Sequence, residues 1–215
     1  MPVVKRLQDE AYDNLKEKIA GGILVEGTLY SESQMTKELG MSRTPVRDAL
    51  LRLSMEGLIE IFPSRGFAVR KVSKTELKET LEIRSVLESY AAYALAEQIE
   101  TPHARETLVK LNKNIDDQER LLLSANPSIT KFVELNSVFH NIMIDFLQND
   151  GISQIYKKYE SSIREINYNH FKNYQEQVQE TFKGHIQILA LIRSGEKEQA
   201  FTRAKNHCNV ALFSR

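Results

Sequence analysis

The residues of this chain that are best equipped for chemistry are two arginines near the N-terminus and three histidines in the second half. Arg43 and Arg47 lie four residues apart in the segment SRTPVRDALLRL, so they share one face of any helix formed there. The face opposite them carries Val46, Ala49 and Leu50. A planar guanidinium matches the O6 and N7 acceptors of guanine. The spacing therefore predicts a helix that presents arginines to base edges.

The elements that would position these arginines are short and closely spaced. Helices are predicted for residues 7–19, 31–40 and 42–57, and glycines mark the ends of the last two. The apolar period then changes, and residues 58–62 and 67–70 are predicted as strands around a Pro-Ser-Arg-Gly turn. Two helices separated by about three residues, followed by a hairpin, are typical of a winged helix-turn-helix.

Several polar and backbone groups beside the two arginines are candidates for DNA contact. The first turn of a recognition helix faces the groove, and its free N–H groups can bind phosphate. The turn of the hairpin can reach the minor groove or the phosphate backbone. The alternative is that two arginines on a helix form only a solvated face. The candidate DNA-binding residues are Arg43, Thr44, Pro45, Arg47, Ser64, Arg65 and Gly66.

Beyond residue 72 the pattern is helical throughout. Apolar residues at helical spacing, with breaks near Thr101-Pro102, Pro127-Ser128, Asn149-Asp150-Gly151 and Gly195, predict about six helices packed as an antiparallel bundle. We therefore expect a mainly α protein with a DNA-binding domain at residues 1–72 and a helical domain at residues 73–215. A helix start at Ser73-Lys74-Thr75-Glu76 leaves almost no linker between the two.

The histidines His140, His185 and His207 each fall on the inward stripe of a different predicted helix, and Asn136 lies one turn before the first of them. Imidazole nitrogens suit zinc, nickel, iron or copper. A single inward histidine is more often a core residue bonded to a carbonyl or a water. Three on separate helices indicate a shared metal, which would satisfy all of them. A dry, metal-free pocket is the alternative.

Composition limits the other possibilities. The chain has 29 Lys+Arg and 29 Asp+Glu over 215 residues, so DNA affinity must come from local clustering rather than from net charge. A single cysteine, Cys208, excludes an intramolecular disulfide framework and suits a reducing cytoplasm. The sequence shows no secretory signal and no apolar run of membrane length. We expect a cytoplasmic protein without a membrane partner.

Residues 42–53, followed by Glu56-Gly57-Leu58, resemble the DNA-binding domain of the GntR family of bacterial transcription regulators. Leu29-x-Ser31-Glu32 and Pro63-x-Arg65-Gly66 also fit that family. The resemblance covers roughly residues 5–72. It implies a homodimer that binds a short inverted repeat in double-stranded DNA. It also implies contacts to DNA from Arg43, Thr44, Arg47 and Gly66, whereas Ser33 stands where some members carry a DNA-contacting arginine.

Residues 75–215 resemble the C-terminal effector domain (FCD type) of the FadR branch of the same family, in its shorter, six-helix VanR form. Arg84-x-x-x-Glu88 matches a motif of the first effector helix, and the three histidines match the family's histidine positions. The resemblance implies a divalent transition metal, zinc or nickel, bound by Asn136, His140, His185 and His207. Metal-binding members normally carry aspartate where this chain has Asn136, which predicts weaker binding and a need for an acidic effector.

Three residues are candidates for holding such an effector, a small carboxylate. Arg84 has a guanidinium suited to bidentate pairing with a carboxylate, although an ion pair with Glu88 one turn away is an equal alternative. Arg164 and Tyr168 lie on a later helix and are predicted to line the same cavity. Surface placement is the alternative for both.

Together these patterns predict a ligand-responsive transcription regulator, a repressor by default, that is not an enzyme. It would bind its operator as a homodimer and sense a small organic acid at a metal site. One alternative is a metal-free regulator or architectural DNA binder whose bundle serves dimerisation. A metal-dependent hydrolase is a further alternative, disfavoured because no carboxylate lies at helical spacing to the histidines.

Overall fold

The computed structural model describes residues 6–20, 22–71, 73–173 and 176–213. The chain divides into two compact units, Met1–Ser73 and Lys74–Arg215. Each unit has its own core of buried apolar side chains. The predicted fold class, a winged helix-turn-helix and an all-helical bundle, is confirmed.

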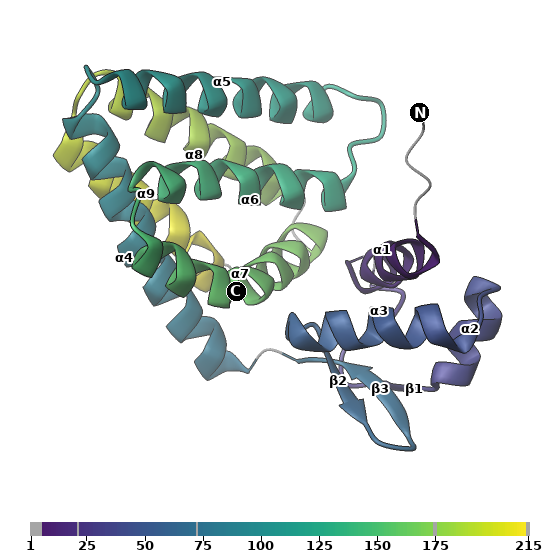
Figure 1. Ribbon diagram of the computed structural model, residues 1–215. Helices are drawn as coiled ribbons and strands as arrows, with labels where there is room; N and C mark the ends of the chain where they lie inside the picture. The colour runs from purple at the N-terminus through teal and green to yellow at the C-terminus, as the bar shows by residue number, and fades with distance from the viewer. Residues whose placement is uncertain (1–5, 21, 72, 174–175, 214–215) are drawn as a thin grey trace. The chain divides into compact units, whose positions relative to one another are not determined.

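The first unit is built from three helices and a small sheet (Figure 1). Its helices are α1 (Leu7–Ala20), α2 (Glu32–Leu39) and α3 (Arg43–Met55). Leu15 of α1 and Val46 and Leu53 of α3 have no exposed surface, so the two helices bury their apolar stripes against each other. Polar groups add to this packing, because the Tyr12 hydroxyl donates to Glu56 at 2.7 Å.

The sheet has three strands, one more than the sequence predicted. It consists of β1 (Leu29–Tyr30), β3 (Gly66–Val69) and β2 (Ile59–Phe62), in that order and antiparallel throughout. The extra strand accounts for Gly66, whose φ is 125° and where a Cβ would overlap the carbonyl oxygen of Tyr30. A glycine is required because β1 passes too close for any side chain.

The predicted helix caps are confirmed in part. Thr101 caps α5 (Pro102–Leu122) in the second unit by accepting a hydrogen bond from the Ala104 N–H at 3.1 Å, and Pro102 follows as the first residue of that helix. Gly40 ends α2 in the left-handed conformation with φ 64°. Ser31 and Ser42 occupy the N-cap positions of α2 and α3, but neither side chain makes a capping hydrogen bond.

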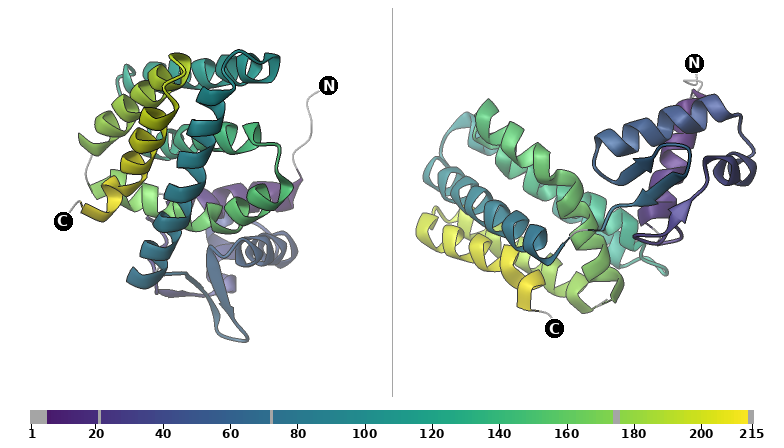
Figure 2. Two further views of the ribbon diagram at one scale, coloured as in Figure 1. Left: turned by 90° about the vertical axis from the view of Figure 1, so that its left-hand side faces the viewer. Right: turned by 90° about the horizontal axis from the view of Figure 1, so that it is seen from below.

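The second unit is a helical bundle of six described helices. They are α4 (Lys74–Glu97), α5 (Pro102–Leu122), α6 (Ile129–Phe146), α7 (Asp150–Asn173), α8 (Glu176–Arg193) and α9 (Lys197–Phe213). α4 and α9 lie side by side and run in opposite directions (Figure 2). Two contacts show this: Lys197 at the start of α9 pairs with Glu97 at the end of α4 at 2.8 Å, and the Cys208 thiol further along α9 donates to Glu88 further back on α4 at 2.9 Å.

The interior of the bundle is built mainly from apolar side chains, with buried polar groups among them. Ala91, Leu95 and Leu111 have no exposed surface, and neither do Phe139 and Met143. Small residues on α4 permit the close approach of α9. None of the described helices is both long and apolar enough to cross a bilayer.

Candidate nucleic-acid interface and metal centre

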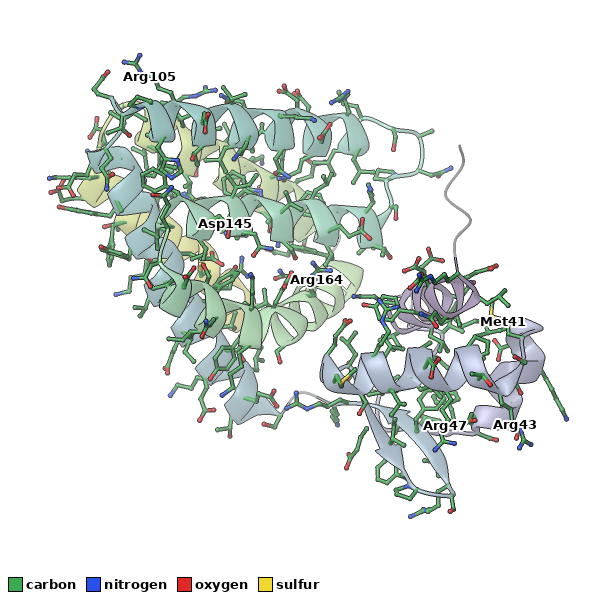
Figure 3. All side chains as sticks on the ribbon, viewed as in Figure 1. Met41, Arg43, Arg47, Arg105, Asp145 and Arg164 are labelled. Carbon is green, nitrogen blue, oxygen red and sulfur yellow. The ribbon has the colours of Figure 1, made fainter. Side chains whose placement is uncertain are left out.

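Helix α3 and the hairpin border a groove on the first unit. The groove has a volume of about 430 Å³, and it includes Ser33 of α2, Arg43 and Arg47 of α3, and Arg65 of the hairpin turn among its lining residues. Figure 3 shows Arg43 and Arg47 on the side of α3 that faces the strands. All three arginines are exposed, so their guanidinium groups can approach a nucleic acid without rearrangement of the core.

The other predicted DNA-contacting residues divide into exposed and buried positions. Thr44 and Ser64 are exposed, and Ser64 has a φ of 59° in the turn between β2 and β3. Pro45 differs from the prediction, because it is buried at the start of α3 and packs inside the domain. Gly66 is half-buried, and its need for glycine comes from the approach of β1.

The three predicted histidines meet inside the second unit, although they come from three helices. His140 lies on α6, His185 on α8 and His207 on α9. All are buried, and one nitrogen from each lies within 4.8 Å of the others. Nε2 of His140 and Nε2 of His185 lie 3.3 Å apart. The bundle therefore gathers three imidazoles around one point.

Asn136, one turn before His140 on α6, is 1 % exposed. Neither its amide oxygen nor its amide nitrogen has a hydrogen-bond partner among the described residues. A buried amide left without partners costs roughly 1–3 kcal/mol. The position of Asn136 thus leaves an oxygen available for a ligand that is not part of the polypeptide.

A buried carboxylate on α4 orients the first histidine. Glu88 has no exposed surface, and its Oε2 lies 2.7 Å from Nδ1 of His140. Its other contacts are the Arg84 guanidinium at 2.7 Å, the Tyr156 hydroxyl at 2.6 Å and the Cys208 thiol at 2.9 Å. Because a carboxylate only accepts, its proximity favours the tautomer of His140 with the proton on Nδ1 and the lone pair on Nε2.

An amide orients the second histidine in the same way. Nδ1 of His185 lies 2.8 Å from Oε1 of Gln118 on α5, and the ring stacks on Phe139 with a centroid distance of 4.2 Å. Nε2 of His185 consequently faces Nε2 of His140. Sequence reasoning missed both Glu88 as a partner of His140 and Gln118, because the partners come from other helices.

The protonation states follow from burial. Burial lowers the pKa of His185 and of His207 well below the usual range, and the neighbouring imidazoles lower both further. Burial also lowers the pKa of His140, an effect that Glu88 opposes only in part. Burial would raise the pKa of Glu88, but Arg84 and His140 outweigh it and hold that pKa below its usual range. The site thus has neutral imidazoles beside an ionised carboxylate.

Two further residues shape the site, and no role was predicted for either of them from the sequence. Gly184, just before His185, has no room for a side chain, because a Cβ there would overlap the His207 ring and lie 3.0 Å from Nη2 of Arg203. Arg203 lies one turn before His207 on α9, and its guanidinium contributes to the lowered pKa values of His185 and His207. The four-residue spacing of Arg203 and His207 could have indicated from the sequence that Arg203 lies on the same helix face as this histidine.

The predicted effector-binding residues are only partly brought together. Arg84 is 4 % exposed and pairs with Glu88, the alternative that the sequence left open. Its Nη1 also donates to Asn167 at 3.3 Å. Arg164 is half-buried on α7 and pairs with Glu160 at 2.7 Å (Figure 3). The side chain of Tyr168 lies outside the described part of the structure.

Comparison with known protein families matches both units. Residues 7–69 match the family described as bacterial regulatory proteins, gntR family, and residues 79–210 match the FCD domain. The second match spans more than half of the chain. The two matched segments correspond to the winged unit and to the helical bundle.

Two known relatives are HTH-type transcriptional regulators, and one solved structure has a similar fold. The chain is 25% identical over 201 residues, 92% of this chain and 86% of the relative, to the uncharacterized HTH-type transcriptional regulator YdhC of Bacillus subtilis. It is 28% identical over 137 residues, 64% of this chain and 58% of the relative, to the HTH-type transcriptional repressor RspR of Escherichia coli. The structure of E. coli McbR/YncC has a similar fold, with a TM-score of 0.70, 22% identity and 97% coverage of both chains.

The contact between Gly184 and His207 leads to a prediction about stability. We expect Gly184→Ala to lower the free energy of unfolding by about 1–3 kcal/mol, because the added methyl group must displace a buried imidazole. Chemical denaturation of the two proteins, followed by circular dichroism, measures the difference.

The matched control is Gly151→Ala, another glycine in a helix. A Cβ at Gly151 would lie 3.3 Å from the exposed side chain of Asn149, its nearest neighbour. We expect that change to be neutral or to stabilise by up to about 1 kcal/mol. Equal effects of the two substitutions would show that the His207 ring moves away without cost.

Proposed function

We propose a specific role for this chain, which belongs to the GntR family of bacterial regulatory proteins, has an FCD domain and is a DNA-binding transcription regulator. In our proposal it is a cytoplasmic, homodimeric repressor. A metal-bound organic acid controls its binding to DNA. In this proposal the winged unit binds an inverted-repeat operator, and the bundle holds a divalent transition metal and a small carboxylate. The family and the relatives are transcription regulators rather than enzymes.

One observation carries the proposal for a metal. Nε2 of His140 and Nε2 of His185 face each other at 3.3 Å, while Nδ1 of His185 faces the Gln118 oxygen and Nδ1 of His140 lies 2.7 Å from the Glu88 carboxylate. Two lone pairs at this distance repel unless a cation lies between them. Burial lowers the pKa of both imidazoles, which disfavours a proton in that role. Two nitrogens bound at the tetrahedral angle to one zinc ion lie about 3.3–3.4 Å apart.

The donor set fits zinc or nickel better than a harder cation. Three neutral imidazoles and one amide oxygen are borderline ligands that suit late first-row metals. His140, His185 and His207 would hold the ion, with Asn136 as the fourth group, because its unpartnered oxygen needs a positive neighbour. When bound, the metal supplies an electrophilic centre for a carboxylate.

The charge of the site supports an acidic effector. The imidazoles and Asn136 bring no charge, and the charge of Glu88 is balanced by Arg84 at 2.7 Å. A dication in this pocket would therefore lack a counter-charge, and an anionic ligand would supply it. Arg84 and Arg203 both lower the pKa of the histidines, so their positive charge extends to the place where a carboxylate would bind. We retain Arg84, with Arg164 and Tyr168, as the proposed effector-binding residues.

Regulation requires that the effector bind two states of the dimer with different affinity. The proposed metal would be bound by residues of α6, α8 and α9 together. Binding of the metal and its carboxylate would therefore favour one relative placement of these helices. Relief of repression by the ligand is the direction we propose. The alternative of an architectural DNA binder predicts neither a bound metal nor a response to acids.

The exposed arginines of α3 give a prediction about DNA. Arg47→Ala should weaken binding to an operator selected in vitro by about 1–3 kcal/mol and relax the choice of base at one position. Fluorescence anisotropy at one fixed salt concentration, with operator and random duplexes, measures both effects.

The control for that experiment is Arg105→Ala, because Arg105 is exposed on α5 in the other unit and pairs with Glu100 at the surface. It should leave DNA affinity unchanged. An equal loss on operator and random DNA would mean that Arg47 contacts phosphate and does not read a base.

The histidine cluster gives a prediction about metal content. Protein purified without chelator should contain about one zinc or nickel ion per chain by elemental analysis. His185→Ala and His207→Ala should lose it while keeping the helical circular dichroism. Removal of a metal-binding histidine should lower metal affinity by more than the roughly 10–100-fold loss expected when a residue that only orients such a histidine is removed.

His103→Ala is the matched control, since His103 stacks on Phe146 outside the cluster. It should retain the metal. A wild-type protein that neither contains a metal nor binds added Zn²⁺ would contradict the metal site.

Asn136 gives a third prediction. Asn136→Asp should tighten Zn²⁺ binding by at least about tenfold, because a carboxylate attracts a dication by about 8 kcal/mol at 4 Å in protein-like surroundings before its desolvation is subtracted. Competition with a chromophoric chelator measures the affinity. An unchanged affinity would mean that position 136 does not touch the ion.

A further inference from the structure

Helix α5 supplies none of the proposed metal ligands, yet it reaches the site through two buried amides. Asn114 and Gln118 lie one turn apart on α5 and are 4 % and 0 % exposed. Gln118 contacts His185 of α8, and Asn114 contacts the backbone of α6 at Leu135. The two amides thus link a fixed backbone group to an imidazole.

Asn114 and Gln118 form a series of hydrogen bonds from the Leu135 carbonyl to His185. The direction of each bond follows from that carbonyl, which can only accept. The carbonyl oxygen of Leu135 only accepts, so the group of Asn114 that faces it at 3.1 Å must be the amide nitrogen. The oxygen of Asn114 then accepts from the amide nitrogen of Gln118 at 2.6 Å. The oxygen of Gln118 is left to face Nδ1 of His185 at 2.8 Å.

Since the oxygen of Gln118 can only accept, Nδ1 of His185 must donate and must carry the ring proton. The other tautomer would place two acceptors against each other and leave the Gln118 oxygen without a partner in the core. An unsatisfied buried acceptor of this kind costs roughly 1–3 kcal/mol. The ring is therefore held with its Nε2 lone pair directed at Nε2 of His140.

We propose that Gln118, fixed by Asn114, is a positioning residue that holds His185 in the Nδ1–H tautomer required for metal binding through Nε2. This inference rests on the proposed metal site only for the consequence of the tautomer, not for the tautomer itself. His140 is oriented by a charged group and His185 by a neutral one, so the two supports differ in the charge they bring.

The experiment uses the full-length protein with ¹⁵N-labelled histidine, first without metal. Long-range ¹H–¹⁵N spectra report which ring nitrogen carries the proton, and loss of a signal in His185→Ala assigns it. The wild-type protein should show the Nδ1–H form at His185. Gln118→Met, similar in size but lacking a strong acceptor, should lose that form, and Gln118→Glu should retain it because a carboxylate oxygen still accepts.

Zinc affinity is the second measurement, made by chelator competition. Gln118→Met should bind Zn²⁺ about 10–100-fold more weakly than wild type. Asn114→Ala should shift the tautomer and the affinity in the same direction, and it provides a second test if Gln118→Met does not fold. Asn112→Met is the matched control on α5, because Asn112 contacts Arg193 rather than His185; it should change neither result.

Two outcomes would overturn the inference: an Nε2–H form of His185 in wild type, or a tautomer and a zinc affinity that do not change in Gln118→Met. If the wild-type tautomer is as expected and responds to Gln118→Met, but no zinc binds, the positioning role stands and the proposed metal site fails. The two claims are therefore tested separately.

Discussion

The bundle depends on one buried carboxylate more than on any other polar group. Glu88 on α4 has no exposed surface, and it is contacted by Arg84 of the same helix, His140 of α6, Tyr156 of α7 and Cys208 of α9. An isolated ion in a protein core costs several kcal/mol. Four helices must therefore be placed so that their donors converge on this charge, and the same placement brings His140 and His207 to one point.

The winged unit works under a different constraint. Its core is apolar and is formed where α1 crosses α3, which leaves the opposite face of α3 free for Arg43 and Arg47. The approach of β1 to β3 fixes the base of the hairpin at Gly66, and the turn with Arg65 extends from that base. Stability and DNA contact thus use separate residues within the unit, except that Gly66 serves the sheet as well as the predicted DNA surface.

Much of this architecture could be predicted from periodicity, because an apolar stripe reveals which face of a helix is inward. That reasoning found the helices, the exposed arginines and the three inward histidines. It missed β1, which has only two residues and no alternation to detect. It also misplaced Pro45, because a first-turn position does not reveal whether the ring faces the core. The partners of the histidines were beyond its reach: Gln118 lies 67 residues from His185, and periodicity does not specify which helices become neighbours.

The arrangement around Glu88 also argues against the alternative of a hydrolytic metal centre. A hydrolytic metal centre needs a general base near the metal-bound water, and Glu88 is the carboxylate nearest to His140 among the described residues. Its oxygens already accept from Arg84, Tyr156 and Cys208, besides lying against the His140 ring. Arg84 and His140 hold its pKa below the usual range, which makes it a weak base, and burial keeps it from solvent. A carboxylate so fully engaged orients the His140 ring and is poorly placed to accept a proton from water.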